Sequence, residues 1–228
     1  MRELGNMHCD KSKKKVVIID DHPIVRHALT QLINMEPDMT VAGQADDAAS
    51  GLALVERQQP DAAIVDLSLR DSNGIELVKD LRVRWPRLPI LVVSMHDESL
   101  YAERSLRAGA RGYVTKSEPP QNVLEGLRRT MAGGIYVSDR VASRMLGRIV
   151  NGRGSPESFP IERLSDRELE VFEFIGQGFK TRQIAQKLHL SAKTVDAHRE
   201  NIKRKLKLTA ANELVQQAIA WMQYQSGR

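Results

Sequence analysis

Five short apolar runs, mostly of β-branched residues, alternate with longer amphipathic stretches in the first 137 residues, and this alternation constrains the fold most. The runs occupy residues 16–19, 40–43, 62–65, 90–93 and 112–114. Runs this short that are apolar on both faces are typical of central parallel strands. The stretches with helical character lie near residues 22–35, 47–58, 73–84, 98–108 and 119–132. Because parallel neighbours need crossover helices, the pattern predicts an α/β doubly wound, five-stranded parallel sheet.

The last part of the chain carries no strand signal, and four short helices are expected there. Ser165 and Glu168 have the spacing of a capping box ahead of an apolar run, and this helix should end near residues 176–178. Thr181 and Ser191 are expected to cap the next two helices, which end near residues 188 and 206. A last helix is expected over residues 210–224. The pattern predicts a small all-α domain of four helices.

Composition changes mark the boundaries between these parts. Residues 150–160 are rich in Gly, Pro and Ser and lack periodicity, which indicates a linker, and residues 138–149 read as a connector helix before it. The lysine-rich start of the chain is expected to be a disordered tail. The predicted division is a tail over 1–15, an α/β domain over 16–133, a connector and linker over 134–160, and a helical domain over 161–228.

Charge is distributed unevenly over these parts. The chain of 228 residues has a formal net charge of +5, but residues 16–137 sum to −4 and residues 160–228 to +4. An acidic body with a basic end suggests that only the C-terminal part meets nucleic acid. The hydrophobic fraction of 41% is enough for ordinary cores and excludes wholesale disorder.

Features that would direct the chain to a membrane or an oxidising compartment are missing from the sequence. The single cysteine, Cys9, has no internal disulfide partner and no neighbouring zinc ligands. No run of 18 apolar residues occurs, and the N-terminus has no apolar segment of the signal-peptide kind. We therefore expect a cytoplasmic protein with no membrane partner.

Chemically active residues follow four of the five predicted strands. Ligands of doubly wound sheets bind at the carboxyl ends of the strands; the polar residues at these ends are Asp20, Asp21, Asp66, Ser94 and Lys116. Three converging carboxylates repel one another unless a cation sits among them, and hard oxygen ligands suit Mg²⁺. A cation beside Asp66 would make that carboxylate a usable nucleophile toward phosphorus. Lys116 could pair with a phosphate oxygen, and the Ser94 hydroxyl could turn toward a new phosphoryl group.

Each of these residues also has an ordinary interpretation when taken alone. Asp21 could be only a turn or helix cap, Ser94 a loop serine, and Tyr113 a half-buried core aromatic. Their joint occurrence in order after successive strands favours the functional interpretation.

Four motifs fit one known domain. They are Ile18-Ile19-Asp20-Asp21-His22; Ile64-Val65-Asp66-Leu67 with Gly74 eight residues after the aspartate; Val92-Val93-Ser94-Met95-His96-Asp97; and Gly109-Ala110-Arg111-Gly112-Tyr113-Val114-Thr115-Lys116. With them, residues 16–133 resemble the receiver domain of bacterial two-component response regulators, which has a flavodoxin-like fold. The resemblance implies that Asp66 is the phosphoacceptor and that Asp21 and Asp66 bind Mg²⁺ (or Mn²⁺). It also implies that Asp20 acts mainly through water and that the carbonyl of Ser68 completes the protein ligands.

The same resemblance assigns the switch residues. Ser94 and Tyr113 match the switch hydroxyl and switch aromatic of the family, and Lys116 matches the lysine that contacts the phosphoryl group. Two positions depart from the family pattern: Arg70 and Ser117 stand where proline is frequent. These departures bear on the lifetime of the phosphoryl group more than on the chemistry.

The second and third predicted helices of the C-terminal part have helix-turn-helix proportions. At 100° per residue, Val195, Ile202 and Leu206 share one face of the later helix, while Lys193 and Arg204 lie on the opposite face. A basic helix face is often only solvated, but its place in a basic helix-turn-helix favours DNA. The predicted DNA-contacting residues are Thr181, Lys187, Lys193, Thr194, Asp196, Ala197, Glu200, Asn201, Lys203, Arg204 and Lys205.

A second resemblance covers residues 164–223. It rests on Leu164-Ser165-x-Arg167-Glu168, Gly178, Ile184-Ala185, Leu188, Ser191-x-Lys193-Thr194-Val195-x-x-His198, Ile202 and Lys205-Leu206. These residues resemble the LuxR-type helix-turn-helix of the NarL/FixJ class of response regulators. In that class the last helix contributes to dimerisation, for which the candidates here are Leu214, Ala218, Trp221 and Met222; a core role for some of them is equally compatible with the pattern.

The sequence hypothesis is a phosphorylation-dependent, DNA-binding transcriptional regulator. A sensor histidine kinase would phosphorylate Asp66, and the phosphorylated homodimer would bind a promoter operator in double-stranded DNA. The chain would not be an enzyme beyond Mg²⁺-dependent self-phosphorylation and autodephosphorylation at Asp66. One alternative is an orphan regulator that works without phosphorylation. The other is a Mg²⁺-dependent phosphohydrolase, disfavoured because Ser68 stands where such enzymes need a second aspartate.

Overall fold

The computed structural model describes residues 13–69, 72–150, 160–188 and 190–226. The chain divides into two compact units. The first, the α/β unit, comprises Met1–Met95 and Ala108–Tyr136; the second, the helical unit, comprises His96–Arg107 and Val137–Arg228. The predicted linker at 150–160 and the predicted tail at 1–15 fall mainly outside the described residues, as do Arg70 and His189.

The α/β unit is built on one parallel five-stranded sheet, which confirms the predicted fold class. Its strands run in the order β2-β1-β3-β6-β7. Their bounds are β1 (Lys14–Ile19), β2 (Met39–Ala45), β3 (Ala62–Val65), β6 (Ile90–Ser94) and β7 (Gly112–Thr115). The chain adds β2 on one side of β1 and the later strands on the other side, so the topological switch point lies between β1 and β3. A sheet of this kind binds its ligands at that point. The topology therefore places the candidate site before any side chain is considered.

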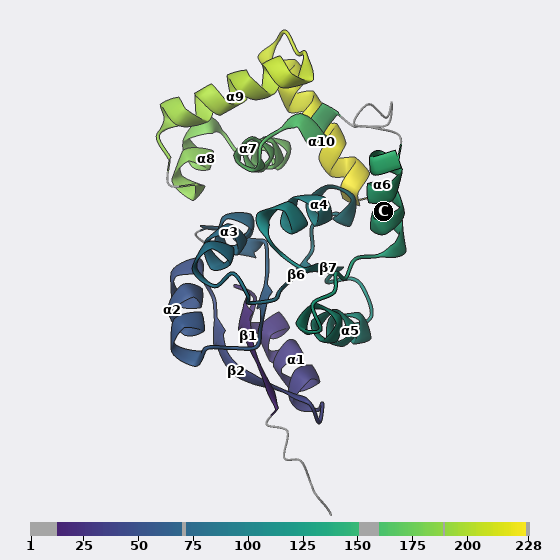
Figure 1. Ribbon diagram of the computed structural model, residues 1–228. Helices are drawn as coiled ribbons and strands as arrows, with labels where there is room; N and C mark the ends of the chain where they lie inside the picture. The colour runs from purple at the N-terminus through teal and green to yellow at the C-terminus, as the bar shows by residue number, and fades with distance from the viewer. Residues whose placement is uncertain (1–12, 70–71, 151–159, 189, 227–228) are drawn as a thin grey trace, which may run out of the picture. The chain divides into compact units, whose positions relative to one another are not determined.

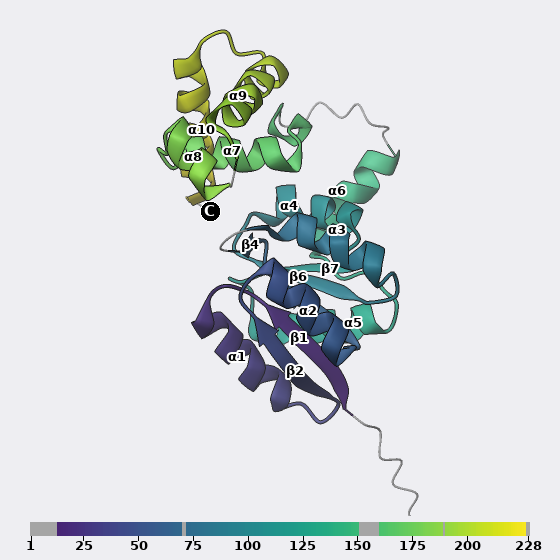
Figure 2. The same ribbon diagram turned by 90° about the vertical axis from the view of Figure 1, so that its left-hand side faces the viewer.

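Helices cover both faces of the sheet (Figures 1 and 2). Apolar residues of α1 (Pro23–Asn34) and α5 (Pro120–Met131) share one core cluster with β1, β3, β6 and β7. On the other face lie α2 (Ala48–Gln58) and α3 (Gly74–Arg84). Val16, Val17, Ile18 and Ile19 have no exposed surface, because a central strand with helices on both faces is buried on both sides.

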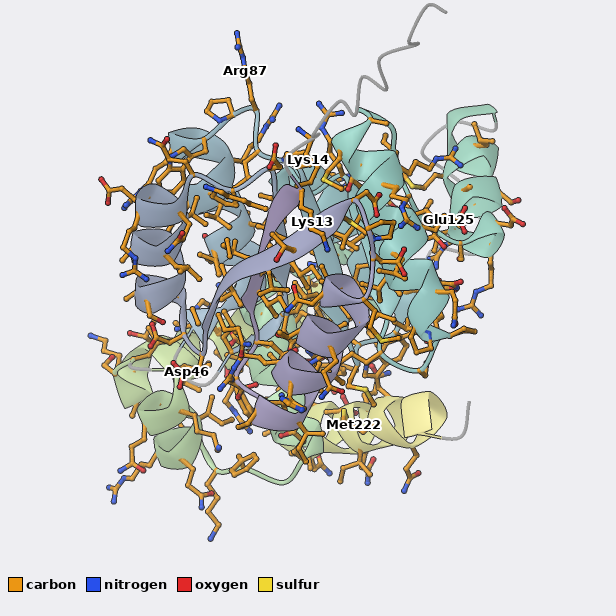
Figure 3. The ribbon with its side chains drawn as sticks, turned by 90° about the horizontal axis from the view of Figure 1, so that it is seen from below. Lys13, Lys14, Asp46, Arg87, Glu125 and Met222 are labelled. Atoms are coloured by element: carbon orange, nitrogen blue, oxygen red, sulfur yellow. The ribbon has the colours of Figure 1, made fainter. Side chains whose placement is uncertain are left out.

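Two short features were not predicted. The sheet begins at Lys14, which pairs with Met39 of β2. The Lys14 ammonium also lies 2.9 Å from Asp61. Lys14 (Figure 3) and Lys15 are therefore sheet residues and not part of the tail. A two-stranded hairpin of β4 (Ser68–Leu69) and β5 (Ser72–Asn73) follows Asp66. Strands of two residues carry no periodicity, so the sequence gives no signal for them.

The helical unit contains α4 (Glu98–Ala108) except for its last residue, and all elements after residue 137. These are α6 (Asp139–Val150), the 3-10 helix η1 (Pro160–Arg163), α7 (Asp166–Gly176), α8 (Thr181–Lys187), α9 (Ala192–Leu206) and α10 (Ala211–Ser226). The last four confirm the four predicted helices. Thr181 is the first residue of α8 and not its cap, because Lys180 has the extended backbone of the N-cap and its N–H is bound by the side chain of Gln183 at 2.9 Å.

Candidate functional site

The acidic site forms where β1 and β3 end. Asp20 and Asp21 follow β1, and Asp66 follows β3. The strands are paired so that Ile19 lies opposite Val65, and the N–H of Asp66 donates to the carbonyl of Ile19 at 2.8 Å. The sheet register therefore fixes the acidic pair beside Asp66.

These carboxylates form a tight, largely buried cluster. Oxygen atoms of Asp20, Asp21 and Asp66 and a ring nitrogen of His22 all lie within 4.8 Å of one another. Asp20 has no exposed surface and Asp66 has 1%, while Asp21 is half-buried. The structure thus brings together the predicted acidic residues.

Lys116 provides the positive charge that compensates this cluster. Its Nζ lies 2.8 Å from Oδ2 of Asp20 and 2.7 Å from Oδ2 of Asp66. Burial lowers the pKa of the Lys116 ammonium, but the hydrogen bonds and charges of Asp20 and Asp66 outweigh burial, so the pKa lies above its usual value. The N–H of Lys116 also donates to the carbonyl of Ser94 at 2.8 Å, which ties the end of β7 to the end of β6.

The two predicted switch residues are both enclosed. Ser94 ends β6 with no exposed surface, and Tyr113 in β7 is 2% exposed. A movement of either side chain would therefore require its surroundings to repack. Their switch roles stay predictions.

The turn after Asp66 is tightly built. The N–H of Gly74 donates to the carbonyl of Leu67 at 3.0 Å, closing the β4–β5 hairpin. A Cβ at position 74 would lie only 2.2 Å from the backbone oxygen of Asp66. Ser68 lies in β4 opposite Asn73, and the ligand role of its carbonyl stays a prediction.

The donor set fits a hard divalent cation. Carboxylate oxygens of Asp20, Asp21 and Asp66 converge within 4.8 Å, and the single ammonium of Lys116 balances only part of their negative charge. Three carboxylates around one point supply the oxygen ligands that Mg²⁺ or Mn²⁺ prefers. The residues present therefore fit the cation that the sequence predicts.

Two basic residues of this site were not predicted. His22 Nδ1 lies 2.6 Å from Oδ1 of Asp21, and an Arg26 guanidinium N–H donates to the carbonyl of Asp20. The position of His22 directly after the acidic pair is a sequence signal that could have identified it. Arg26 has no such signal, because only the first turn of α1 brings it back to the end of β1.

In the helical unit, α8 and α9 form the helix-turn-helix (Figure 1). Ser191 caps α9 by accepting from the N–H of Thr194 at 3.0 Å. Val195 and Ile202 have no exposed surface, and Leu206 has 8%. The opposite face is exposed at Lys193, Asp196, Ala197, Glu200 and Arg204. The predicted orientation of α9 is therefore the observed one.

The other predicted DNA-contacting residues differ in how they are held. Lys187 is exposed, and its Nζ lies 4.8 Å from the ring centroid of Phe179. Thr181 donates to Asp196 at 3.2 Å, and Lys203 pairs with Glu200 at 2.9 Å. Thr194 and Asn201 are half-buried.

Lys205 differs from the other predicted phosphate contacts. Its Nζ pairs with the buried carboxylate of Glu168 on α7 at 2.5 Å. Burial raises the pKa of Glu168, but hydrogen bonds from Lys205 and Ser165 outweigh burial and leave the pKa below its usual value. Lys205 therefore fastens α9 to α7.

The predicted dimer residues on α10 divide into two pairs, and the core role that the sequence left open applies to one of them. Leu214 and Ala218 have no exposed surface, because α10 packs on α7; a Cβ at Gly176 would lie 2.6 Å from the carbonyl oxygen of Ala218. They are core residues and offer no surface to a second chain. Trp221 and Met222 are half-buried, and their dimer role stays a prediction.

Comparisons with known proteins identify both domains. Residues 16–128 match the family described as "Response regulator receiver domain", and residues 162–218 match "Bacterial regulatory proteins, luxR family". The chain belongs to the two-component response regulators of the NarL/FixJ class, in which a receiver domain precedes a LuxR-type helix-turn-helix domain. Such proteins are DNA-binding transcription regulators and not enzymes in the usual sense.

Individual relatives match over nearly their whole length. The chain is 34% identical to the "Oxygen regulatory protein NreC" of Staphylococcus carnosus over 209 residues, covering 90% of this chain and 96% of the relative. It is 25% identical to RcsB of Salmonella enterica serovar Typhimurium bound to promoter P1flhDC in the presence of phosphomimetic BeF3⁻, with a TM-score of 0.68 over 95% of this chain and all of RcsB. A structure of two RcsB dimers bound to two parallel DNAs is 26% identical, with a TM-score of 0.55 over 90% of this chain and 97% of that one.

Among the described residues, the structure contains no helix that is both long and apolar enough to cross a membrane.

Proposed function

We propose that Asp66 accepts a phosphoryl group from a sensor histidine kinase. The cation, Mg²⁺ or Mn²⁺, would be bound by Asp20, Asp21, Asp66 and the Ser68 carbonyl. In the phosphorylated protein, a cytoplasmic homodimer would bind operator DNA. The observation that carries the proposal is the difference between the two oxygens of Asp66. Oδ2 lies 2.7 Å from the Lys116 ammonium, whereas Oδ1 is buried without a hydrogen-bond partner in the described part of the chain. Oδ1 is therefore the oxygen available to attack phosphorus.

The transfer exchanges one bond to phosphorus for another. Oδ1 of Asp66 forms the new P–O bond while the P–N bond of the phosphohistidine breaks, and the leaving imidazole nitrogen keeps the electron pair and takes a proton from solvent. When bound, the divalent cation neutralises charge on the transferring group. Lys116 already holds the neighbouring oxygen and can pair with a phosphoryl oxygen, so its single positive charge offsets part of the charge of about −1.5 to −2 that the phosphoryl group carries.

The switch would act through the enclosed residues Ser94 and Tyr113. The phosphoryl oxygens draw the Ser94 hydroxyl and Lys116 inward, and Tyr113 repacks as the end of β6 adjusts. To move a two-state switch from 1:99 to 99:1 takes about 5.5 kcal/mol. This is within reach of several charge-assisted hydrogen bonds formed together.

On the DNA side, the exposed face of α9 is the proposed recognition surface. Two such helices in a two-fold dimer would enter successive major grooves ~34 Å apart. The promoter-bound RcsB structure with its phosphomimetic and the RcsB dimers on DNA support this arrangement. Of the four residues of α10 predicted for the dimer, Trp221 and Met222 are the two that are partly exposed in this chain.

Mass spectrometry tests the chemistry. The full chain is incubated with acetyl phosphate and Mg²⁺, and we expect a mass gain of one phosphoryl group in the wild type and in Asp80→Asn, an exposed carboxylate on α3. We expect no gain in Asp66→Asn or when the cation is chelated. No gain in the wild type, or an equal gain in Asp66→Asn, contradicts the assignment.

Titration of operator fragments tests the coupling. Binding should tighten at least ~10-fold on phosphorylation of the wild type and stay unchanged in Asp66→Asn. Equal affinity before and after phosphorylation would favour the orphan regulator, whose output comes from protein contacts alone.

A further inference from the structure

His22 is a fourth member of the acidic cluster. It is the N-cap residue of α1, but its side chain makes no capping hydrogen bond. Its Nδ1 faces the carboxylates instead, at 2.6 Å from Oδ1 of Asp21, 3.3 Å from Oδ1 of Asp20 and 3.9 Å from Oδ2 of Asp66. The backbone helps to hold this orientation, because the N–H of His22 donates to Oδ1 of Asp20 at 2.8 Å.

The four donor atoms are close enough to hold one ion. Two ligands on one divalent ion, each at ~2.1 Å, lie at most about 4.2 Å apart. The observed spread of 4.8 Å therefore needs only a small contraction. The imidazole is 58% exposed and the carboxylates are mostly buried, so His22 is the member that can move most easily toward an ion.

Lys116 and His22 approach different oxygens of Asp20, although for both of them Oδ2 is the nearer oxygen of Asp66. Lys116 binds Oδ2 of Asp20, whereas His22 contacts Oδ1 of the same carboxylate. An ion bound between His22 and the carboxylates would approach from the Oδ1 side of Asp20. The two positive groups would therefore contact different oxygens of Asp20.

The imidazole changes which ions the site prefers. Mg²⁺ takes oxygen ligands and keeps several waters, whereas imidazole nitrogen suits borderline transition ions such as Ni²⁺, Co²⁺ and Zn²⁺. Three carboxylates alone are a hard oxygen site. An added nitrogen ligand raises the affinity for borderline ions without a matching gain for Mg²⁺.

We infer that His22 is a metal ligand that selects among divalent ions, so that this receiver site takes a nitrogen-preferring transition ion in competition with Mg²⁺. The inference rests on the cation site of the proposed function and adds a ligand and a specificity to it. The competing role is positional: His22 would only orient Asp21 by donating a hydrogen bond, and would then affect every cation alike.

Calorimetric titration separates these roles. The full chain without a histidine tag is titrated at pH 8 with Ni²⁺ and, separately, with Mg²⁺. The variants are His22→Gln and a control, His27→Gln, which changes an exposed histidine of α1 that contacts Gln31. We expect His22→Gln to weaken Ni²⁺ binding about 10- to 100-fold and Mg²⁺ binding less than ~3-fold, with both affinities unchanged in His27→Gln.

Each other result has a definite meaning. Unchanged Ni²⁺ affinity in His22→Gln, or equal weakening for both ions, overturns the inference while leaving the Mg²⁺ site intact. If the wild type binds neither ion, the cation site of the proposed function fails as well.

Pulsed electron paramagnetic resonance gives a second readout that does not depend on affinity. With one equivalent of Cu²⁺ bound, an ion that imidazole nitrogen suits, the wild type and His27→Gln should show coupling to a directly bound ¹⁴N nucleus, and His22→Gln should not. Absence of nitrogen coupling in the Cu²⁺-loaded wild type would overturn direct ligation.

Discussion

The acidic site and α9, the proposed recognition helix, place their charged side chains in opposite ways. At the first, Asp20 and Asp66 are almost fully buried and depend on one ammonium, that of Lys116. At the second, Lys193 and Arg204 lie exposed on α9 over an apolar face that packs inward. A bond-forming site must fix a few charges in a dry place, whereas a DNA-binding face needs many charges that stay hydrated until phosphates arrive.

The difference has an energetic consequence. Removal of one partner from a buried cluster leaves a charge without compensation, and the protein loses stability. Removal of one exposed cation leaves the fold unchanged and weakens only binding, by an amount that depends on salt. Substitutions at the acidic site should therefore change the free energy of unfolding, whereas substitutions on the exposed face of α9 should change DNA affinity.

The largest effect should come from Lys116→Met. Without the ammonium, the carboxylates of Asp20 and Asp66 stay buried and uncompensated, so we expect the α/β unit to lose about 3 kcal/mol of unfolding free energy in chelator. Added Mg²⁺ should restore much of the loss, because a cation then takes over the compensation. Urea unfolding with and without Mg²⁺ measures both values.

The control for this change is Lys79→Met. Lys79 forms an i,i+3 surface pair with Glu76 at 2.8 Å, and its loss should cost at most about 0.5 kcal/mol with no response to Mg²⁺. Similar losses of unfolding free energy in the two variants would mean that the acidic site depends on Lys116 no more than a surface ion pair depends on its lysine.

A smaller and contrasting pair of effects is expected on α9. Lys193→Ala should weaken DNA binding about 10-fold and make the salt dependence shallower by about one unit, with unfolding unchanged. Lys205→Ala should instead lower the stability of the helical unit by about 1–2 kcal/mol, because the buried Glu168 loses its partner. Fluorescence anisotropy over a salt series and calorimetric unfolding provide the readouts; the reverse pattern would refute the distinction between the two lysines.

The smallest effect is a pH dependence at Glu168. Because the folded-state pKa of Glu168 lies below its usual value, its contribution to stability is present above the unfolded pKa and is lost as pH falls through the folded one. Glu168→Gln should therefore cost about 1 kcal/mol near pH 7 and progressively less below about pH 4.5. Thermal unfolding from pH 3.5 to 7.5 measures the difference.

Glu200→Gln serves as the comparison, because Glu200 is exposed on α9 and pairs with Lys203 of the same helix. The Glu200→Gln substitution should change the stability of the protein little between pH 3.5 and 7.5. A constant difference for Glu168→Gln would show that packing of the side chain, and not its ionisation, supports the helix pair.

Regular elements could be predicted because their signals are local. The buried runs around Ile18 and Ile64 and the cap residues Ser165 and Ser191 each act within one strand or one helical turn. Parallel topology then brings Asp20 and Asp66 together without further information, because neighbouring parallel strands end at the same edge.

What the sequence missed depends on side chains that meet across elements. The sequence predicts that Lys205 contacts phosphate, but in the structure Lys205 pairs with Glu168 of α7. Leu214 and Ala218 form a stripe that fits either a dimer or a core, and only the packing of α10 on α7 decides for the core. The place of His22 directly after the acidic pair is visible in the sequence, but its nearness to three carboxylates depends on how the chain turns into α1.

The lack of space at position 74 limits which substitutions a chain of this kind can accept. Even a methyl group there would collide with the main-chain oxygen of Asp66, so every substitution shifts the backbone that bears the proposed phosphoacceptor. A random library screened for loss of signalling should therefore yield hits at Gly74 with alanine, the mildest replacement available, as readily as with bulky residues. Tolerance at this codon would depend on backbone space and not on the chemical character of the replacement.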